Sequence, residues 1–154
     1  MPSYDILRDA AIFYYKNLRQ YPDALAYFEK RGIHIDVIKQ FGLGFASDAW
    51  SDLLKAMANK YSKSDLEKVG LIIENKDKTN HYDRFRNRIM FPIINPKGKV
   101  IGFGGRVMDD ALPKYLNSPE TEVFNKSQTL YGLNLAKNHL SDKQIGRASC
   151  RERV

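Results

Sequence analysis

Three arginines at every second position are the residues whose type and spacing most directly suggest chemistry. Arg84, Arg86 and Arg88 precede the apolar run IMFPII, and a glycine-rich segment, KVIGFGG, leads to Arg106. A guanidinium group presents a planar fork of N–H donors that fits a phosphate, and it is less strongly hydrated than an ammonium group. No acidic residue lies within 84–106. The pattern predicts a phosphate-binding surface, with the solvated outer face of a sheet as the alternative.

A second group of polar and aromatic residues follows in the segment PKYLNSPETEVFNK, residues 113–126. It contains Lys114, Tyr115, Asn117 and Lys126. Aromatic rings can stack on unpaired bases, and the neighbouring cations and amides can bind phosphates and base edges, so this composition suits single-stranded nucleic acid. An irregular surface loop is the alternative. The arginines nearby favour nucleic-acid binding.

The sequence shows no residue pattern for hydrolysis, metal binding or nucleotide binding. His34, His81 and His139 have no surrounding pattern of a hydrolytic triad, and with one cysteine in the chain they do not predict a zinc site. The GFGG segment matches neither common nucleotide-binding fingerprint. Asp109 and Asp110 suit a turn better than a metal site. We therefore expect no catalytic residue, metal ion or cofactor in this chain.

The elements that must position these residues change in period along the chain. Apolar residues recur at helical spacing in residues 3–20, 23–32, 35–40, 47–60 and 62–70. The period then becomes two, which predicts strands at 71–75, 84–94, 99–108 and 114–117. Helices followed by strands indicate an α+β fold with a small, mainly antiparallel sheet. Trp50 and Tyr82 are expected to pack in the core or at its edge, with exposed rings that stack on a ligand as the alternative.

The turn NPKG, residues 95–98, predicts a hairpin between the two central strands. Alternation along a regular strand would give Arg84, Arg86 and Arg88 one face and the apolar residues the other. Simple pairing across the turn leaves Arg106 on the apolar side. We expect a one-residue bulge, at Pro92 or at the glycines 104 and 105, that brings all four arginines together. The glycines of the return strand would let a ligand approach its backbone.

Composition sets the remaining limits. The chain of 154 residues is 43% apolar and 12% aromatic, as in a globular protein, and its net charge of +7 favours a polyanionic partner. It has no signal-peptide pattern and no apolar run near the roughly 20 residues that span a bilayer. We expect a cytoplasmic protein with no membrane association.

The final ten residues, IGRASCRERV, have no apolar period. They can be encoded by a sequence that resembles a widely used sequencing adapter, and we interpret 145–154 as a tail derived from it. Residues 1–144 would then form one incomplete domain.

The segments DRFRNRIMFPI, GKVIGFGGRV and PKYLNSPET, followed by FNK and LYGL, resemble the RNA polymerase core of bacterial DNA primases of the DnaG type. The resemblance extends over nearly all of residues 3–140. It implies that a basic α+β subdomain guides the single-stranded DNA template and the RNA primer towards a metal-binding Toprim subdomain. The template-contacting positions implied are Arg84, Arg86, Arg88, Arg106, Lys114, Tyr115, Asn117 and Lys126.

The resemblance also implies parts that this chain lacks. A zinc-binding domain precedes the core in the family, Toprim acids that hold Mg or Mn follow it, and a further C-terminal part binds the replicative helicase. We therefore expect a fragment of a primer-synthesising enzyme that binds template but does not polymerise alone. A stand-alone, non-catalytic nucleic-acid-binding module is the alternative. A hydrolase acting on a phosphorylated small molecule is disfavoured because no nucleophile has a positioned base.

Overall fold

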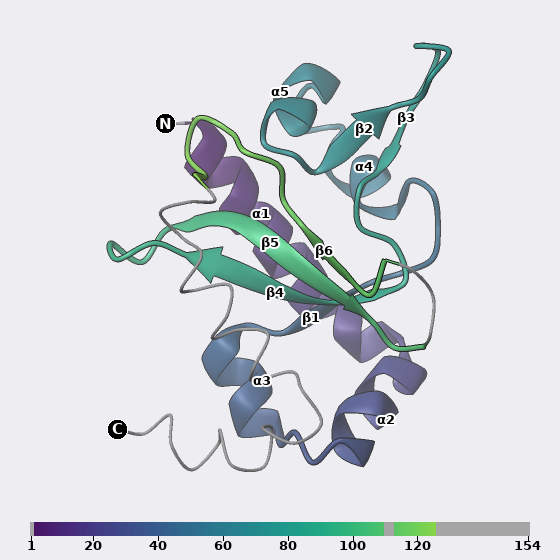
Figure 1. Ribbon diagram of the computed structural model, residues 1–154, viewed down its shortest axis with the longest axis vertical. Coiled ribbons are helices and arrows are strands. Elements are labelled where there is room, and N and C mark those ends of the chain that lie inside the picture. Colours follow the sequence, from purple (N-terminus) through teal and green to yellow (C-terminus); the bar gives the residue numbers. More distant parts are fainter. Residues whose placement is uncertain (1, 110–112, 126–154) are drawn as a thin grey trace.

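The computed structural model describes residues 2–109 and 113–125 (Figure 1). Lys126 and the expected adapter-derived tail lie outside these residues. Helices dominate the first half, as expected: α1 (Pro2–Asn17) with the 3-10 turn η1 (Leu18–Gln20), α2 (Pro22–Lys30), α3 (Ile35–Phe41), α4 (Asp52–Met57) and α5 (Lys63–Lys68). One short strand, β1 (Gly44–Ala46), lies between α3 and α4, and strands form the later part: β2 (Ile72–Glu74), β3 (His81–Asp83), β4 (Arg88–Ile94), β5 (Val100–Val107) and β6 (Tyr115–Asn117).

Two antiparallel sheets form in the described part of the chain. The larger one has the strand order β1-β4-β5-β6, and β2 pairs with β3 in a separate hairpin. The predicted α+β class is confirmed. The largest boundary errors are two predicted starts: the helix expected over 47–60 begins only at Asp52, and the strand expected over 84–94 begins only at Arg88. Both errors concern short linkers that turn out to carry candidate site residues.

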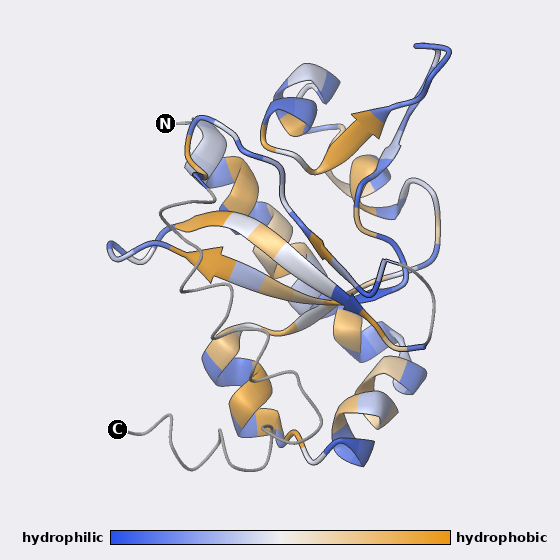
Figure 2. Cartoon of the chain, in the orientation of Figure 1, coloured by the Kyte–Doolittle hydropathy of each residue, from blue (hydrophilic) through white to orange (hydrophobic). Residues whose placement is uncertain are grey.

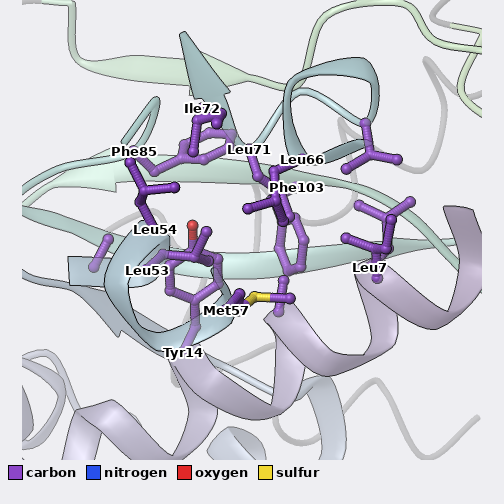
Figure 3. Packing of buried hydrophobic residues seen from close by; sticks show 14 of the residues in the cluster. Leu7, Tyr14, Leu53, Leu54, Met57, Leu66, Leu71, Ile72, Phe85 and Phe103 are labelled. Carbon is purple, nitrogen blue, oxygen red and sulfur yellow. The ribbon is translucent and has the colours of Figure 1, made fainter. Parts of the chain in front are cut away.

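Apolar side chains cover both faces of the larger sheet. On one face, α1, α4 and α5 form a core in which the rings of Tyr14 and Phe103 meet edge to face at 5.2 Å (Figure 3). On the other face, α2 and α3 pack on Ile89 and Phe91. The hydropathy colouring shows apolar β2 and β4 and a hydrophilic tip on the β2–β3 hairpin (Figure 2). A sheet buried on both sides has no solvated face on which a row of arginines could lie.

The close fit of α1 against the sheet depends on Gly44. A Cβ atom there would lie 2.5 Å from the carbonyl carbon and oxygen of Tyr14, closer than any side chain allows. Backbone atoms of α1 and β1 are therefore in direct contact. No helix in the described residues is long and apolar enough to cross a membrane.

The register of the central hairpin corrects the predicted placement of the arginines. Arg106 pairs with Ile89, and Arg88 pairs with Val107, so these two arginines lie on opposite faces. The ladder is irregular between Ile93 and Ile94, where β5 has one extra residue, and not at either predicted bulge position. The turn is also longer by one residue than simple pairing assumes. The combined offset of two residues returns Arg106 to the face of Ile89, because side chains alternate with a period of two.

The alternation of the first three arginines fails at Asn87. Its φ angle of 55° is left-handed and interrupts the extended chain just before β4. Arg84 and Arg86 consequently belong to the linker between β3 and β4, not to the sheet. The prediction that all four arginines share one face is wrong for this reason.

Candidate nucleic-acid interface

The linker that carries Arg84 and Arg86 is held in place by its backbone. The amide of Arg84 donates to the carbonyl of Leu71 at 2.9 Å, and the amide of Asn87 donates to that of Ser47 at 2.9 Å. Between the two arginines, the fully buried Phe85 packs against Phe103. The linker is therefore anchored through its apolar residue and its amides, and both arginines remain partly exposed.

Arg86 lies over two aromatic rings. Its guanidinium carbon is 3.9 Å from the ring centroid of Trp50 and 5.4 Å from that of Tyr82. The two rings meet edge to face, and Trp50 is 62% exposed. Cation–π contact holds the guanidinium over the indole while Trp50 remains largely exposed to solvent. The expectation that Trp50 packs in the core or at its edge is wrong, and the exposed ring corresponds to the alternative.

Sequence reasoning favoured burial of Trp50 because its surrounding residues, SDAWSD, were assigned to a helix. In the structure this segment is a loop that ends at the start of α4. Trp50 stands at helical spacing from Leu53, Leu54 and Met57, so the apolar period itself favoured burial of the ring. A hollow of ≈ 600 Å³ lies beside it, lined by Trp50, Tyr82, Asn80, Lys76 and neighbouring residues.

Asp83 fixes the position of this loop relative to β3. Its carboxylate accepts hydrogen bonds from the amides of Leu53 at 2.8 Å and Leu54 at 3.1 Å, so it caps α4 from another element. Its own amide donates to the carbonyl of Trp50 at 2.7 Å. Burial raises the pKa of Asp83 to about 6, against the lowering effect of the two amides. The residue next to Tyr82 thus positions both aromatic rings.

The positive charges of Arg84 and Arg86 are not neutralised within residues 2–109 and 113–125. Neither side chain forms an ion pair there, and the Nε atoms of both are buried without a hydrogen-bond acceptor. Burial lowers the pKa of Arg84, although a guanidinium remains protonated in proteins. Two fixed cations without a counterion form a favourable site for an anion.

Arg88, by contrast, bonds to the protein itself. It is buried, and its two terminal nitrogens donate to the carbonyls of Pro113 at 2.7 Å and Lys114 at 3.3 Å. Burial, with a smaller effect from the charge of Arg86, lowers its pKa. Its guanidinium therefore ties the start of β6 to β4. The exposed Lys114 is placed by this contact.

Arg106 forms a separate group on the opposite face. Its side chain is buried and donates a hydrogen bond to the hydroxyl of Tyr27. Its Nε atom donates to the hydroxyl of Tyr115 at 3.3 Å, and the guanidinium lies over the Tyr115 ring. Tyr115 is its pairing partner across β5 and β6, and Asn117 pairs with Gly104. The Oδ1 atom of Asn117 is buried without a partner among the described residues.

The glycines of β5 make room for protein, which corrects the expectation that they admit a ligand. A Cβ at Gly104 would lie 2.2 Å from the Phe91 ring, and one at Gly102 would lie 3.1 Å from Ser118. One at Gly105 would lie 3.1 Å from the Arg88 side chain. Their absent side chains therefore allow tight internal packing.

The predicted residues thus form two groups at one end of the β4–β5 ladder. Arg84 and Arg86 precede the Arg88–Val107 pair, and Arg106 lies next to it in the other strand. The hydrophilic colouring converges at this end of the sheet (Figure 2). Arg88 and Lys114 lie between the groups, and Lys126 is outside the described residues.

Comparison with known proteins identifies the family. The family described as the DNA primase catalytic core, N-terminal domain, matches residues 13–137. The DNA primase of Clostridium acetobutylicum is 50% identical over 144 residues, which are 92% of this chain and 24% of that protein. A DNA primase of Neisseria meningitidis serogroup A is 52% identical over 123 residues, 80% of this chain and 20% of that protein.

A solved structure, that of the DnaG primase catalytic domain bound to ssDNA, superposes with a TM-score of 0.76 at 39% identity. The match covers 88% of this chain and 46% of that one. The chain therefore spans about a quarter or less of its curated relatives and under half of this structural neighbour. Since the family match extends over most of its residues, the chain belongs to the family of N-terminal domains of the DNA primase catalytic core.

Proposed function

We propose that this chain is the template-binding part of a DNA primase, an enzyme that synthesises RNA primers on single-stranded DNA. The observation that carries the proposal is the pair of unneutralised arginines, Arg84 and Arg86, beside the exposed ring of Trp50. In single-stranded DNA the cations would bind the phosphate, and the aromatic face would stack on the neighbouring base. The relative solved with ssDNA supports the assignment of the ligand.

The two groups of residues would act differently on a bound strand. At the linker, Arg84 and Arg86 would bind phosphates, while Trp50 and Tyr82 offer rings beside the hollow of ≈ 600 Å³ for an unpaired base. On the other face, Arg106 holds the Tyr115 ring in place, so Tyr115 and Asn117 would contact the strand and Arg106 would position them.

Arg88 is better suited to positioning than to direct contact, because its donors already bond to the carbonyls of Pro113 and Lys114. Lys114 and Lys126 would add phosphate contacts of the kind that strengthens binding without reading sequence. In this proposal the two partly exposed arginines contact the strand, and the two buried ones, Arg88 and Arg106, position other residues.

Primer synthesis needs residues beyond those described. Nucleotidyl transfer uses divalent metal ions to stabilise the attacking and leaving oxygens. In this proposal a Toprim part of the whole protein holds Mg or Mn, a preceding domain holds zinc, and a C-terminal part binds the replicative helicase. This chain alone would bind template and leave it unextended. A primer-synthesis assay on the protein from the complete gene separates this proposal from a non-catalytic binding module.

Binding is tested by fluorescence anisotropy of a labelled single-stranded DNA of about 15 nucleotides, across a salt series. We expect the double variant Arg84→Ala/Arg86→Ala to bind more weakly and to lose about 1.4 units of the slope of log K against log salt concentration, because each phosphate contact with a single strand contributes about 0.7. Arg8→Ala/Arg19→Ala removes two exposed arginines elsewhere and serves as the matched control. Equal effects of the two double variants would refute the assignment.

A further inference from the structure

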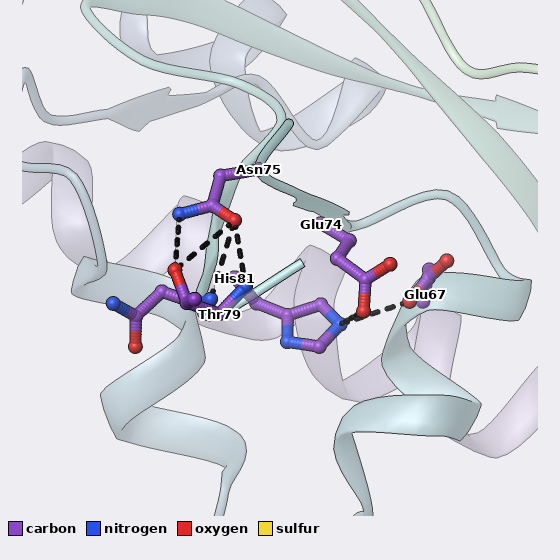
Figure 4. Close-up of polar contacts among 6 residues, drawn as sticks. Glu67, Glu74, Asn75, Thr79 and His81 are labelled. Atoms are coloured by element: carbon purple, nitrogen blue, oxygen red, sulfur yellow. Dashed lines mark hydrogen bonds and ion pairs between the residues drawn. The ribbon is translucent and has the colours of Figure 1, made fainter. Parts of the chain in front are cut away.

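A histidine and two glutamates converge on one side of the β2–β3 hairpin. His81 also lines the hollow beside Trp50 and Tyr82, but none of the three side chains is assigned above to DNA contact. Glu74 and His81 are direct partners in the β2–β3 ladder, so their side chains lie on the same face. Glu67 reaches the same point from the last turn of α5 (Figure 4). Three elements thus each supply one side chain.

The donor atoms are close enough to share an ion. The Nε2 atom of His81 is 2.9 Å from Oε1 of Glu67 and 3.9 Å from Oε2 of Glu74, and one donor atom from each residue falls within 4.8 Å of the other two. Tetrahedral ligands at zinc–ligand distances of about 2.1 Å are about 3.4 Å apart. The observed separations bracket that value, so small side-chain rotations suffice.

The surrounding structure holds these side chains in place before any ion binds. The turn between β2 and β3 is closed by Asn75, whose Oδ1 accepts from the amides of Thr79 at 3.0 Å and Asn80 at 3.3 Å (Figure 4). This closure fixes the register that sets Glu74 opposite His81. Gly70, with a left-handed φ of 81°, ends α5 and turns the chain directly into β2.

The charges favour a cation. Neither glutamate has a lysine or arginine within ion-pair distance in the part of the chain that the structure describes. The imidazole is largely shielded, with 16% of its side chain exposed, whereas both carboxylates are more open to solvent. One neutral imidazole and two carboxylates carry two negative charges, and the open side leaves positions for water on the metal.

From this geometry we propose that Glu67, Glu74 and His81 bind a divalent transition-metal ion, with zinc as the reference ion. The imidazole selects against Mg²⁺ and Ca²⁺, which prefer oxygen ligands alone, and the carboxylates select against thiophilic ions. The ion would link α5 to both strands of the hairpin. This inference does not depend on the proposed template binding, because it concerns other side chains and is measured without DNA.

The test uses the chain of 154 residues carrying Cys150→Ser, so that its one cysteine cannot bind metal. After EDTA treatment and desalting, the protein is titrated with ZnCl₂ by calorimetry, and with Co²⁺ by visible absorption. We expect one saturable site, an upward shift of the thermal midpoint with zinc, and no such event with MgCl₂. Each of His81→Gln and Glu74→Gln should weaken zinc binding at least about tenfold, the loss that even an outer-shell change causes.

His34→Gln is the matched control, because it removes an exposed histidine from another part of the fold and should leave zinc affinity unchanged. Circular dichroism of each metal-free variant shows whether it is folded. Absence of a saturable site in the folded chain would overturn the proposal. It would equally be overturned if His81→Gln and Glu74→Gln bound zinc as tightly as the control.

Discussion

Replacing Asp83 by asparagine should change how the stability of the fold depends on pH. Burial raises the pKa of Asp83 from 3.8 to about 6 in the folded chain. Between these two values the folded state holds a proton that the unfolded state has released, so stability falls as pH rises through this window. The asparagine variant keeps the shape and an amide oxygen for the α4 amides, but its side chain does not titrate.

The magnitude follows from the two pKa values. Each unit of pKa difference between the folded and unfolded states corresponds to about 1.4 kcal/mol of stability. Between about pH 4 and about pH 7, the free energy of unfolding of the wild-type chain should therefore fall by about 2 kcal/mol relative to that of the variant. Any constant cost of the substitution, such as a weaker cap on α4, cancels in this comparison. The sign is as informative as the size, because a carboxylate stabilised by its two amide donors would give the opposite trend.

Urea unfolding followed by circular dichroism at several pH values measures the difference. Asp77→Asn, which removes an exposed carboxylate from the β2–β3 turn, controls for the loss of one negative charge. If the stability of the wild-type chain minus that of the Asp83→Asn variant stays constant, or grows with pH, the amide bonds outweigh burial at this site.

Two further substitutions test the template surface and the packing of the sheet. Trp50→Ala should weaken single-stranded DNA binding by about 1–3 kcal/mol, the usual contribution of one stacked base, while leaving the salt slope nearly unchanged; an unchanged affinity in the anisotropy assay would exclude stacking on this ring. Gly104→Ala should destabilise the fold by about 1–3 kcal/mol in urea unfolding, because its Cβ would meet the Phe91 ring at 2.2 Å. Phe91→Leu should partly restore the alanine variant, and a lack of coupling between these two changes would contradict the clash.

The sequence predicted the helices and strands better than it predicted which face of the sheet each side chain occupies. Apolar periodicity identified the early helices, and the NPKG turn identified the central hairpin, because both are local signals. The face of Arg106 depended on two one-residue offsets, an extended turn and an irregularity after Ile93, whose effects on side-chain direction cancel. Neither offset has a strong local signature.

The candidate site shows the same division. The arginine and aromatic residue types suggested a nucleic-acid surface, but the left-handed backbone at Asn87 decided which arginines belong to a strand. That Arg88 is buried against the carbonyls of Pro113 and Lys114 depends on contacts between distant segments. The grouping of Glu67, Glu74 and His81 likewise appears only once α5 is placed against the hairpin, so a search for closely spaced metal ligands misses it.

The stacking of Arg86 on Trp50 has a further consequence for the entropy of binding. An arginine that is free in solution loses rotamer freedom when it grips a phosphate, at a cost of about 0.5–1.5 kcal/mol for such a side chain. Arg86 already rests over the indole and the ring of Tyr82 in the unbound chain. Its conformational freedom is given up during folding, so a ligand meets a guanidinium that is ordered before it arrives.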